Sequence, residues 1–96
     1  MSPRVVLVED EPLVSMMMED LLTDLGCEVA VFGALAPALA WLSRQDEAPD
    51  GAVLDVNLGG GETVFPLAEA LRARGVPFVF ATGYGILPSD GYPDTP

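Results

Sequence analysis

Acidic side chains follow an apolar run near the N-terminus. Residues 5–8 are all apolar, and Glu9, Asp10 and Glu11 come directly after them. Such a run is typical of a strand buried in a parallel sheet, and a doubly wound sheet keeps its ligand site at the C-terminal ends of its strands. Adjacent carboxylates repel one another unless a cation offsets their charge. This stretch therefore predicts one side of a divalent-metal site.

Two later apolar runs also end in polar side chains. Residues 52–54 lead to Asp55, and residues 78–81 lead to Thr82. The C-terminal ends of parallel strands share one edge of the sheet, so these groups should converge with Asp10 if their strands are neighbours. Magnesium takes one or two carboxylates and keeps room for a phosphate. A carboxylate beside such an ion can act as a nucleophile toward phosphorus, and Asp55 is the central candidate, with Thr82 placed to hydrogen-bond a phosphoryl oxygen.

Each acid also has a plainer interpretation as a helix cap or a solvated loop charge. For Glu11 we favour that interpretation, because acids near a helix N-terminus suit the helix dipole. For Asp10 and Asp55 we favour the functional one, because both follow unbroken apolar runs of the same predicted sheet.

The elements that must position these residues alternate along the chain. Short apolar runs at residues 4–8, 29–32, 52–55 and 78–81 predict strands, and residues 13–25, 34–44 and 62 or 63 to 74 predict helices. This alternation specifies an α/β fold with right-handed crossovers. A flavodoxin-like, doubly wound parallel sheet of order 2-1-3-4 makes the first and third strands neighbours.

The first predicted helix carries one apolar stripe at helical spacing. Its members are Val14, Met17, Met18, Leu21, Leu22 and Leu25. Three consecutive methionines, at residues 16–18, can also form an adaptable binding surface. Two of the three lie on the stripe, so we predict that they pack in the core.

Composition narrows the class of partner. The 96 residues carry 15 acids and four arginines, with no lysine and no histidine, for a formal net charge of −11. This charge disfavours nucleic acids and anionic membranes and fits a basic partner. Because the sequence contains no histidine, catalysis and metal binding by histidine are excluded. Cys27 is the one cysteine, which fits the reducing cytoplasm, and no run is long and apolar enough to span a membrane.

Three motifs give the chain a family resemblance. LVEDEP at residues 7–12, VLDVNLGGG at 53–61 and PFVFATGYG at 77–85 occur in order and at family spacing. Together they resemble the receiver domain of two-component response regulators, in a subgroup with a Phe-Ala-Thr-Gly-x-Tyr signature that is often found as stand-alone receivers. The resemblance implies a single CheY-like domain over residues 1–96, with a matching core at 3–87 and a loop or tail at 88–96.

The resemblance also implies roles for the residues. Asp55 would accept a phosphoryl group from a sensor histidine kinase or a phosphotransfer protein. Mg²⁺ would be held by Asp10, Asp55 and the main-chain carbonyl of Asn57, with Glu9 acting through a metal-bound water. Thr82 would be the switch hydroxyl that moves to meet the phosphoryl group. Such a protein is a signalling phosphoacceptor that assists its own phosphotransfer and dephosphorylation, rather than an enzyme.

The sequence also departs from the family pattern. A receiver normally continues into a fifth strand bearing a lysine and a last helix, and this sequence has no lysine. We therefore expect a C-terminally truncated receiver whose fourth strand, residues 78–81, is an exposed edge open to homodimerisation. Two alternatives stay open. One is a degenerate receiver that acts as a non-phosphorylated protein-interaction module. The other is a metal-dependent phosphohydrolase, which the missing general base and lysine disfavour.

Overall fold

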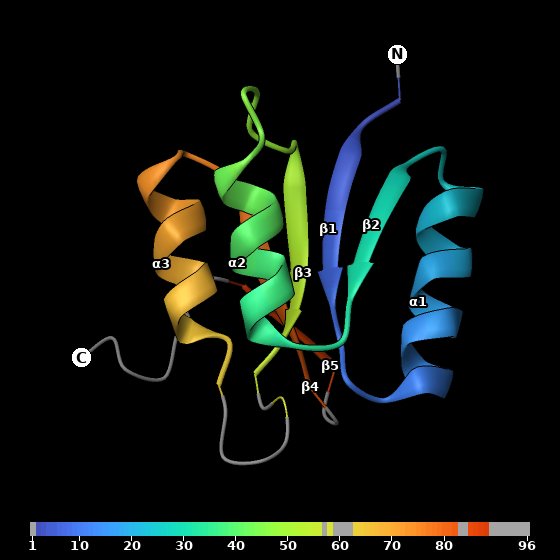
Figure 1. Ribbon diagram of the computed structural model, residues 1–96. Helices are drawn as coiled ribbons and strands as arrows, with labels where there is room; N and C mark the ends of the chain where they lie inside the picture. Colours follow the sequence, from blue (N-terminus) through green and yellow to red (C-terminus); the bar gives the residue numbers. More distant parts are fainter. Residues whose placement is uncertain (1, 57, 59–62, 83–84, 89–96) are drawn as a thin grey trace.

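Three helices and a five-stranded sheet make up the described part of the chain. The computed structural model describes residues 2–56, 58, 63–82 and 85–88, with side chains as far as Ala81. In chain order the elements are β1 (Arg4–Val8), α1 (Pro12–Asp24), β2 (Glu28–Phe32), α2 (Leu35–Ser43), β3 (Gly51–Asp55), α3 (Phe65–Ala73), β4 (Phe78–Thr82) and β5 (Gly85–Pro88). The sheet order is β2-β1-β3-β4-β5 (Figure 1).

The predicted parallel sheet of order 2-1-3-4 is confirmed. β1 pairs in parallel with β2 on one side and with β3 on the other, and β3 pairs in parallel with β4. The predicted strands agree with the observed ones to within one residue at each end. The third helix begins at Phe65 rather than at residue 62 or 63, and Pro66 stands in its first turn, where a missing N–H costs nothing.

Two helices end where the sequence places glycines. Gly26 and Gly75 have φ of 91° and 73°, a region that glycine enters without steric cost. After α3, Gly75 N–H donates to the Arg72 carbonyl and Val76 N–H donates to the Leu71 carbonyl, at 3.0 and 2.9 Å. These bonds satisfy carbonyls that would otherwise be left free at a helix end.

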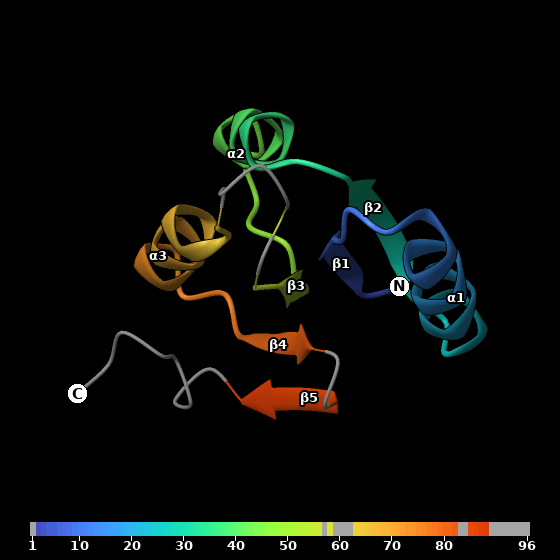
Figure 2. The same ribbon diagram turned by 90° about the horizontal axis from the view of Figure 1, so that it is seen from below.

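The core lies between the sheet and the helices α2 and α3. Both helices cover the same face of the sheet, as Figure 2 shows from below. Phe80 is fully buried at the centre of this layer, with Phe65 and Phe78 packed edge-on against its ring at centroid distances of 6.1 and 5.5 Å. Val6, Val8 and Leu54 point to the same side, as alternate residues of a strand do.

The helix α1 lies alone on the other face of the sheet, and the predicted burial of its apolar stripe is wrong. None of its residues is buried. Only Met18 and Leu22 of the stripe are half-buried. The exposed fractions are 40% for Val14, 71% for Met17, 57% for Leu21 and 72% for Leu25. One flank of the helix contacts β1 and β2. Within the described residues, the other flank faces solvent (Figure 2).

The fourth strand is not an exposed edge, which corrects a second prediction. β5 pairs with β4 in antiparallel register, from Thr82 opposite Gly85 to Val79 opposite Pro88. Only two residues separate the strands, so the chain turns back as a hairpin. This short strand falls where the sequence predicted the start of a loop. The homodimer was expected to form through a free edge of β4, and β5 occupies that edge.

Candidate functional site

The first predicted acids lie where β1 ends. Glu9 N–H donates to the Phe32 carbonyl at 3.0 Å, so the ladder with β2 continues one residue beyond the strand. This places the Glu9 side chain at the sheet edge, where it is only 9% exposed. Asp10 is exposed beside it. Glu11 precedes α1 as its N-cap residue, as expected, although its side chain makes no capping hydrogen bond.

The strand β3 brings the third carboxylate to the same place. Val8 pairs with Leu54, so Asp55, the last residue of β3, lies at the level where Glu9 follows β1. One carboxylate oxygen from each of Glu9, Asp10 and Asp55 lies within 4.8 Å of the other two. The predicted convergence of these acids is therefore present in the structure.

The electrostatics of Glu9 show that the cluster carries unbalanced negative charge. Burial raises the pKa of the Glu9 carboxyl above its usual value, and the neighbouring Asp55 and Asp10 charges raise it further. The Glu11 N–H donates to Glu9 Oε1 at 3.0 Å, which favours the charged form and works in the opposite direction. The net effect is a pKa of the Glu9 carboxyl above its usual value, and a hydrogen bond with the Asp55 side chain contributes to the rise.

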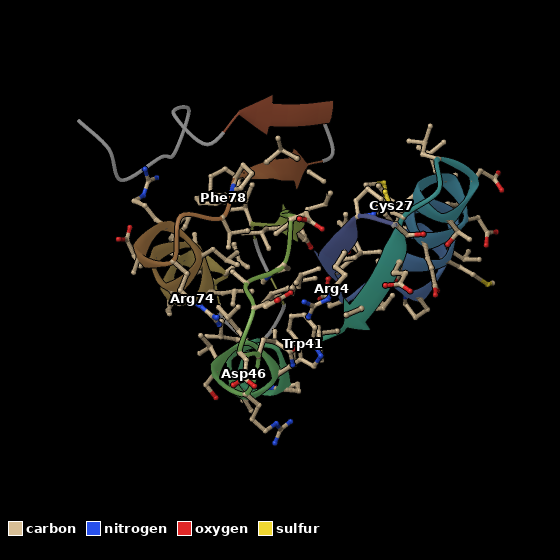
Figure 3. The ribbon with its side chains drawn as sticks, turned by 90° about the horizontal axis from the view of Figure 1, so that it is seen from above. Arg4, Cys27, Trp41, Asp46, Arg74 and Phe78 are labelled. Carbon is tan, nitrogen blue, oxygen red and sulfur yellow. The ribbon has the colours of Figure 1, made fainter. Side chains whose placement is uncertain are left out.

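The arginines lie at the opposite edge of the sheet. Arg4 begins β1 and donates to Gln45 Oε1 at 2.7 Å, and Arg74 donates to the Leu42 and Gln45 carbonyls at 2.7 Å. Figure 3 shows this edge from above, with Arg4 and Arg74 near Asp46. Arg44 caps the end of α2 at the same edge. The fourth arginine, Arg72, lies over the Phe78 ring at the start of β4, with 5.5 Å to its centroid.

This donor set fits a hard divalent cation. Three clustered carboxylates offer the oxygen ligands that Mg²⁺ and Ca²⁺ prefer. A cation would offset the charge that now raises the Glu9 pKa, a role that no arginine fills because all four lie at the other edge. Glu9, Asp10 and Asp55 are thus the residues that could hold a metal.

The structure does not describe the side chains of two predicted site residues. Asn57, whose carbonyl was expected to complete the metal site, lies outside the described residues. The backbone of Thr82 ends β4, and its neighbour Ala81 pairs with Asp55, so Thr82 belongs to the same edge of the sheet. Its hydroxyl lies outside the described part of the chain.

Sequence reasoning missed the surroundings of the acids on the side of α1. An open depression beside Glu9 and Asp10 is also lined by Pro12, Ser15, Met16, Glu19, Val31 and Gly33. Ser15 and Glu19 lie one turn apart on the flank of α1 that faces β2. The four-residue spacing of Ser15 and Glu19 could have identified this flank from the sequence. The prediction instead considered only the apolar stripe of the helix.

Comparison with known proteins agrees with this architecture. The family described as the response regulator receiver domain matches residues 5–88. A search of curated proteins finds no match. Among solved structures, SdrG from Sphingomonas melonis Fr1 is 50% identical, with a TM-score of 0.74 over 84% of this chain and 68% of that one. The receiver domain of the PhyR response regulator from Erythrobacter litoralis is 32% identical, with a TM-score of 0.74 over 86% of this chain.

These proteins are longer than the matched region. This chain covers 64% of the Erythrobacter litoralis protein and 33% of PhyR from Brucella abortus, which is 28% identical with a TM-score of 0.72. Within the described residues, no helix is both long and apolar enough to cross a membrane. The match spans most of the sequence and includes all three converging carboxylates, and the chain belongs to the response regulator receiver domain family.

Proposed function

We propose that this chain is the phosphoacceptor of a two-component phosphorelay, with Asp55 as the residue that is phosphorylated. The observation that carries the proposal is the convergence of Asp55 with Glu9 and Asp10 within 4.8 Å at the end of a parallel sheet. The donor would be a sensor histidine kinase or a phosphotransfer protein. The relay would operate in the cytoplasm, which fits the single cysteine.

The chemistry is a transfer between two protein side chains. An Asp55 carboxylate oxygen forms a bond to phosphorus while the phosphorus–nitrogen bond of the donor phosphohistidine breaks, and the imidazole takes the electron pair. Mg²⁺, when bound, neutralises the charge that develops on the phosphoryl oxygens. Asp10, Asp55 and the Asn57 carbonyl would hold it directly, and Glu9 would do so through water.

Glu9 would set the charge of the unphosphorylated site. Burial and the neighbouring Asp55 and Asp10 charges raise its pKa, so its charged form is disfavoured while no cation is bound. A bound cation would offset the negative charge of the cluster beside the Asp55 carboxylate. The chain's own residues would in this way assist both phosphotransfer and the later hydrolysis of the acyl phosphate.

The signal would then pass to a partner through a population shift between two loop arrangements. Thr82 is proposed as the switch hydroxyl that meets the phosphoryl group. The proposed unit is the single receiver domain of residues 1–96, with residues 3–87 as its core and 88–96 as a loop or tail.

Intact-mass spectrometry tests the proposal. The protein is incubated with acetyl phosphate, with and without Mg²⁺, and we expect one added phosphate that depends on Mg²⁺. Asp55→Ala should abolish the addition. The matched control is Asp46→Asn, an exposed acid at the opposite edge of the sheet, which should label like the wild type. An unmodified wild-type mass, or equal labelling of Asp55→Ala, contradicts the proposal.

A second candidate function is a non-phosphorylated protein-interaction module. The exposed apolar flank of α1 favours it, because large apolar patches mark interaction surfaces. Beryllofluoride separates the two functions, since it mimics a phosphoryl group on a carboxylate. SdrG has been solved in a BeF3-activated conformation, at 51% identity to this chain. Nuclear magnetic resonance shifts at Asp55 and Thr82 on adding beryllofluoride favour the phosphoacceptor, and their absence favours the interaction module.

A further inference from the structure

The strand β2 is the end strand of the sheet, and among the described strands it pairs with β1 alone. Glu28 N–H donates to the Pro3 carbonyl at 2.8 Å, and the Phe32 carbonyl accepts a hydrogen bond from the same side. The direction of the backbone groups alternates along a parallel strand. Val29 and Val31 therefore direct their N–H and C=O groups away from the sheet, which makes this edge a template for a further strand.

The sequence of β2 lacks the features that usually protect an edge strand. Natural edges carry proline, charged side chains within the strand or a bulge. The centre of β2, at residues 29–31, is Val-Ala-Val, and the whole strand keeps an unbroken register with β1. Only Glu28, at its start, is charged. An extended segment can therefore pair with β2 over its full length.

An open hollow of about 120 Å³ lies beside the first half of β2. It is lined by Arg4 and Val5 of β1, residues 28–30 of β2 and Trp41 of α2. The Trp41 ring packs against Phe32 at 5.7 Å between centroids, and the Arg4 guanidinium lies over the same ring at 5.7 Å. Figure 3 shows Arg4 and Trp41 at this end of the sheet. These contacts hold the wall of the hollow in place before anything binds.

The size and lining of the hollow fit one aliphatic side chain. An apolar cavity of about 150 Å³ holds a benzene ring, so a hollow of about 120 Å³ suits a smaller, branched aliphatic group. Alternate side chains of an added strand fall on the same face of the sheet. One of them would lie beside Ala30, whose short side chain leaves the space open. Backbone pairing and a filled pocket together are how sheet edges recognise extended peptides.

The charge around β2 favours a basic segment over a second copy of this chain. Arg4 already donates to Gln45 Oε1 at 2.7 Å, whereas Glu28 is exposed at the start of β2. Two copies, each with a net charge of −11, repel one another. A two-fold pairing of β2 with itself about Ala30 would also place Glu28 opposite the apolar Phe32. A Lys or Arg beside an aliphatic residue is complementary to this edge.

We propose that β2 binds an extended basic segment of a protein partner, which adds a strand to the sheet along Val29 and Val31. One aliphatic side chain of the segment fills the hollow beside Ala30 and Trp41. A neighbouring Lys or Arg pairs with Glu28. The hollow lies at the start of β1, roughly 13 Å or four residue steps from its end, so this surface is separate from the carboxylate cluster.

A titration of the full 96-residue chain with a synthetic peptide tests the proposal. The probe is Lys-Thr-Ile-Thr-Ile-Thr-Lys, which places Ile and Lys on one face of a strand. Trp41 is the single tryptophan, so its fluorescence reports on the hollow alone. We expect saturable binding, with the emission moving to shorter wavelength as an Ile side chain displaces water from the indole. The same peptide with Glu in place of Lys should not bind measurably, because like charges repel.

The pattern of backbone protection identifies strand pairing. Binding should slow hydrogen exchange at the Val29 and Val31 amides by about tenfold or more, because both gain partners, while the Ala30 amide, which faces β1, changes little. Two further peptides carry N-methyl groups, one on its three Thr residues and the other on its two Ile residues. A strand directs only alternate N–H groups toward its neighbour. One methylated peptide should therefore lose about tenfold or more in affinity and the other should retain it.

Two variants of the chain locate the contact. Ala30→Leu should fill the hollow and weaken binding by about tenfold, whereas Ala73→Leu, at an exposed position on α3, should change it less than twofold. Glu28→Lys should weaken binding by about threefold, since it replaces a surface ion pair with repulsion. Glu69→Lys on α3 makes the same change of net charge and is its matched control. Circular dichroism melting checks that all four variants fold.

Four results would overturn the proposal. The first is equal affinity of the probe for Ala30→Leu, Glu28→Lys and the wild type, which would mean general attraction to an acidic protein. The second is equal binding of the two methylated peptides, which would exclude strand pairing. The third is protection that lies on α1 and leaves Val29 and Val31 unchanged. The fourth is a dimer in sedimentation that Ala30→Leu abolishes, which would make this edge an interface between two copies.

Discussion

Removing the charge of Glu9 should stabilise the metal-free protein. The substitution Glu9→Gln keeps an oxygen that can accept from Glu11 N–H, now at 3.0 Å, and its amide can donate to Asp55. It removes a carboxylate that is 9% exposed and has two acidic neighbours within 4.8 Å. Repulsion at that distance costs about 1 kcal/mol with water-like screening and about 3.5 kcal/mol with the screening typical of a protein surface.

We therefore expect the free energy of unfolding at pH 7 to rise by about 1–3 kcal/mol. For a domain of this size each 1 kcal/mol raises Tm by about 4–8 °C. The assay is thermal unfolding in EDTA, followed by circular dichroism. The matched control is Glu69→Gln, an exposed acid on α3, which should leave Tm nearly unchanged.

The dependence on pH gives a second signature of the same group. The folded protein raises the pKa of Glu9, so it binds a proton more tightly than the unfolded chain does. The stability from that proton is fully present below the unfolded pKa of about 4.5 and is lost as pH rises through the higher folded pKa. Wild-type stability should therefore gain from acidification in this window relative to Glu9→Gln. An unchanged or lower Tm in the variant, with a parallel pH profile, would refute the reasoning.

Three further perturbations follow from the structure. Addition of Mg²⁺ should raise the Tm of the wild type and leave Asp10→Asn nearly unchanged in the same thermal assay; equal shifts would place the metal elsewhere. Phe80→Ala should cost about 3–5 kcal/mol in urea unfolding, because its ring is fully buried, and a loss below 1 kcal/mol would contradict that packing. Gly75→Ala should cost about 1–2 kcal/mol, because φ is 73° there, whereas Gly51→Ala, which needs no positive φ, is the control.

The sheet and the acid cluster could be predicted because each depends on one local pattern. Apolar runs that end in a polar residue mark buried parallel strands and their C-terminal edge together. The order of the strands then follows from the few topologies that right-handed crossovers allow. Asp10 and Asp55 are brought together by this logic alone, before any side-chain packing is known.

The burial of α1 and the presence of β5 could not be read in the same way. Helical periodicity identifies the stripe that contains Met17 and Leu21, but it does not say whether another element covers that stripe. The strand β5 holds only Ile86 and Leu87 between Gly85 and Pro88, too short an apolar run to signal a strand. The strand is defined by its antiparallel pairing with β4, and this contact cannot be seen in the residues of β5 alone. The near burial of Glu9 likewise depends on packing around the end of β1.

The placement of the arginines at one edge of the sheet gives the molecule an electrical polarity. Arg4, Arg44 and Arg74 lie at the same edge as Asp46 and Asp50, while no arginine lies beside the carboxylates of Glu9, Asp10 and Asp55 at the other edge. The resulting field exerts a torque on an approaching basic molecule and turns the acid-rich end toward it before contact. Encounters become productive in a larger fraction of collisions, and the association rate falls as ionic strength rises.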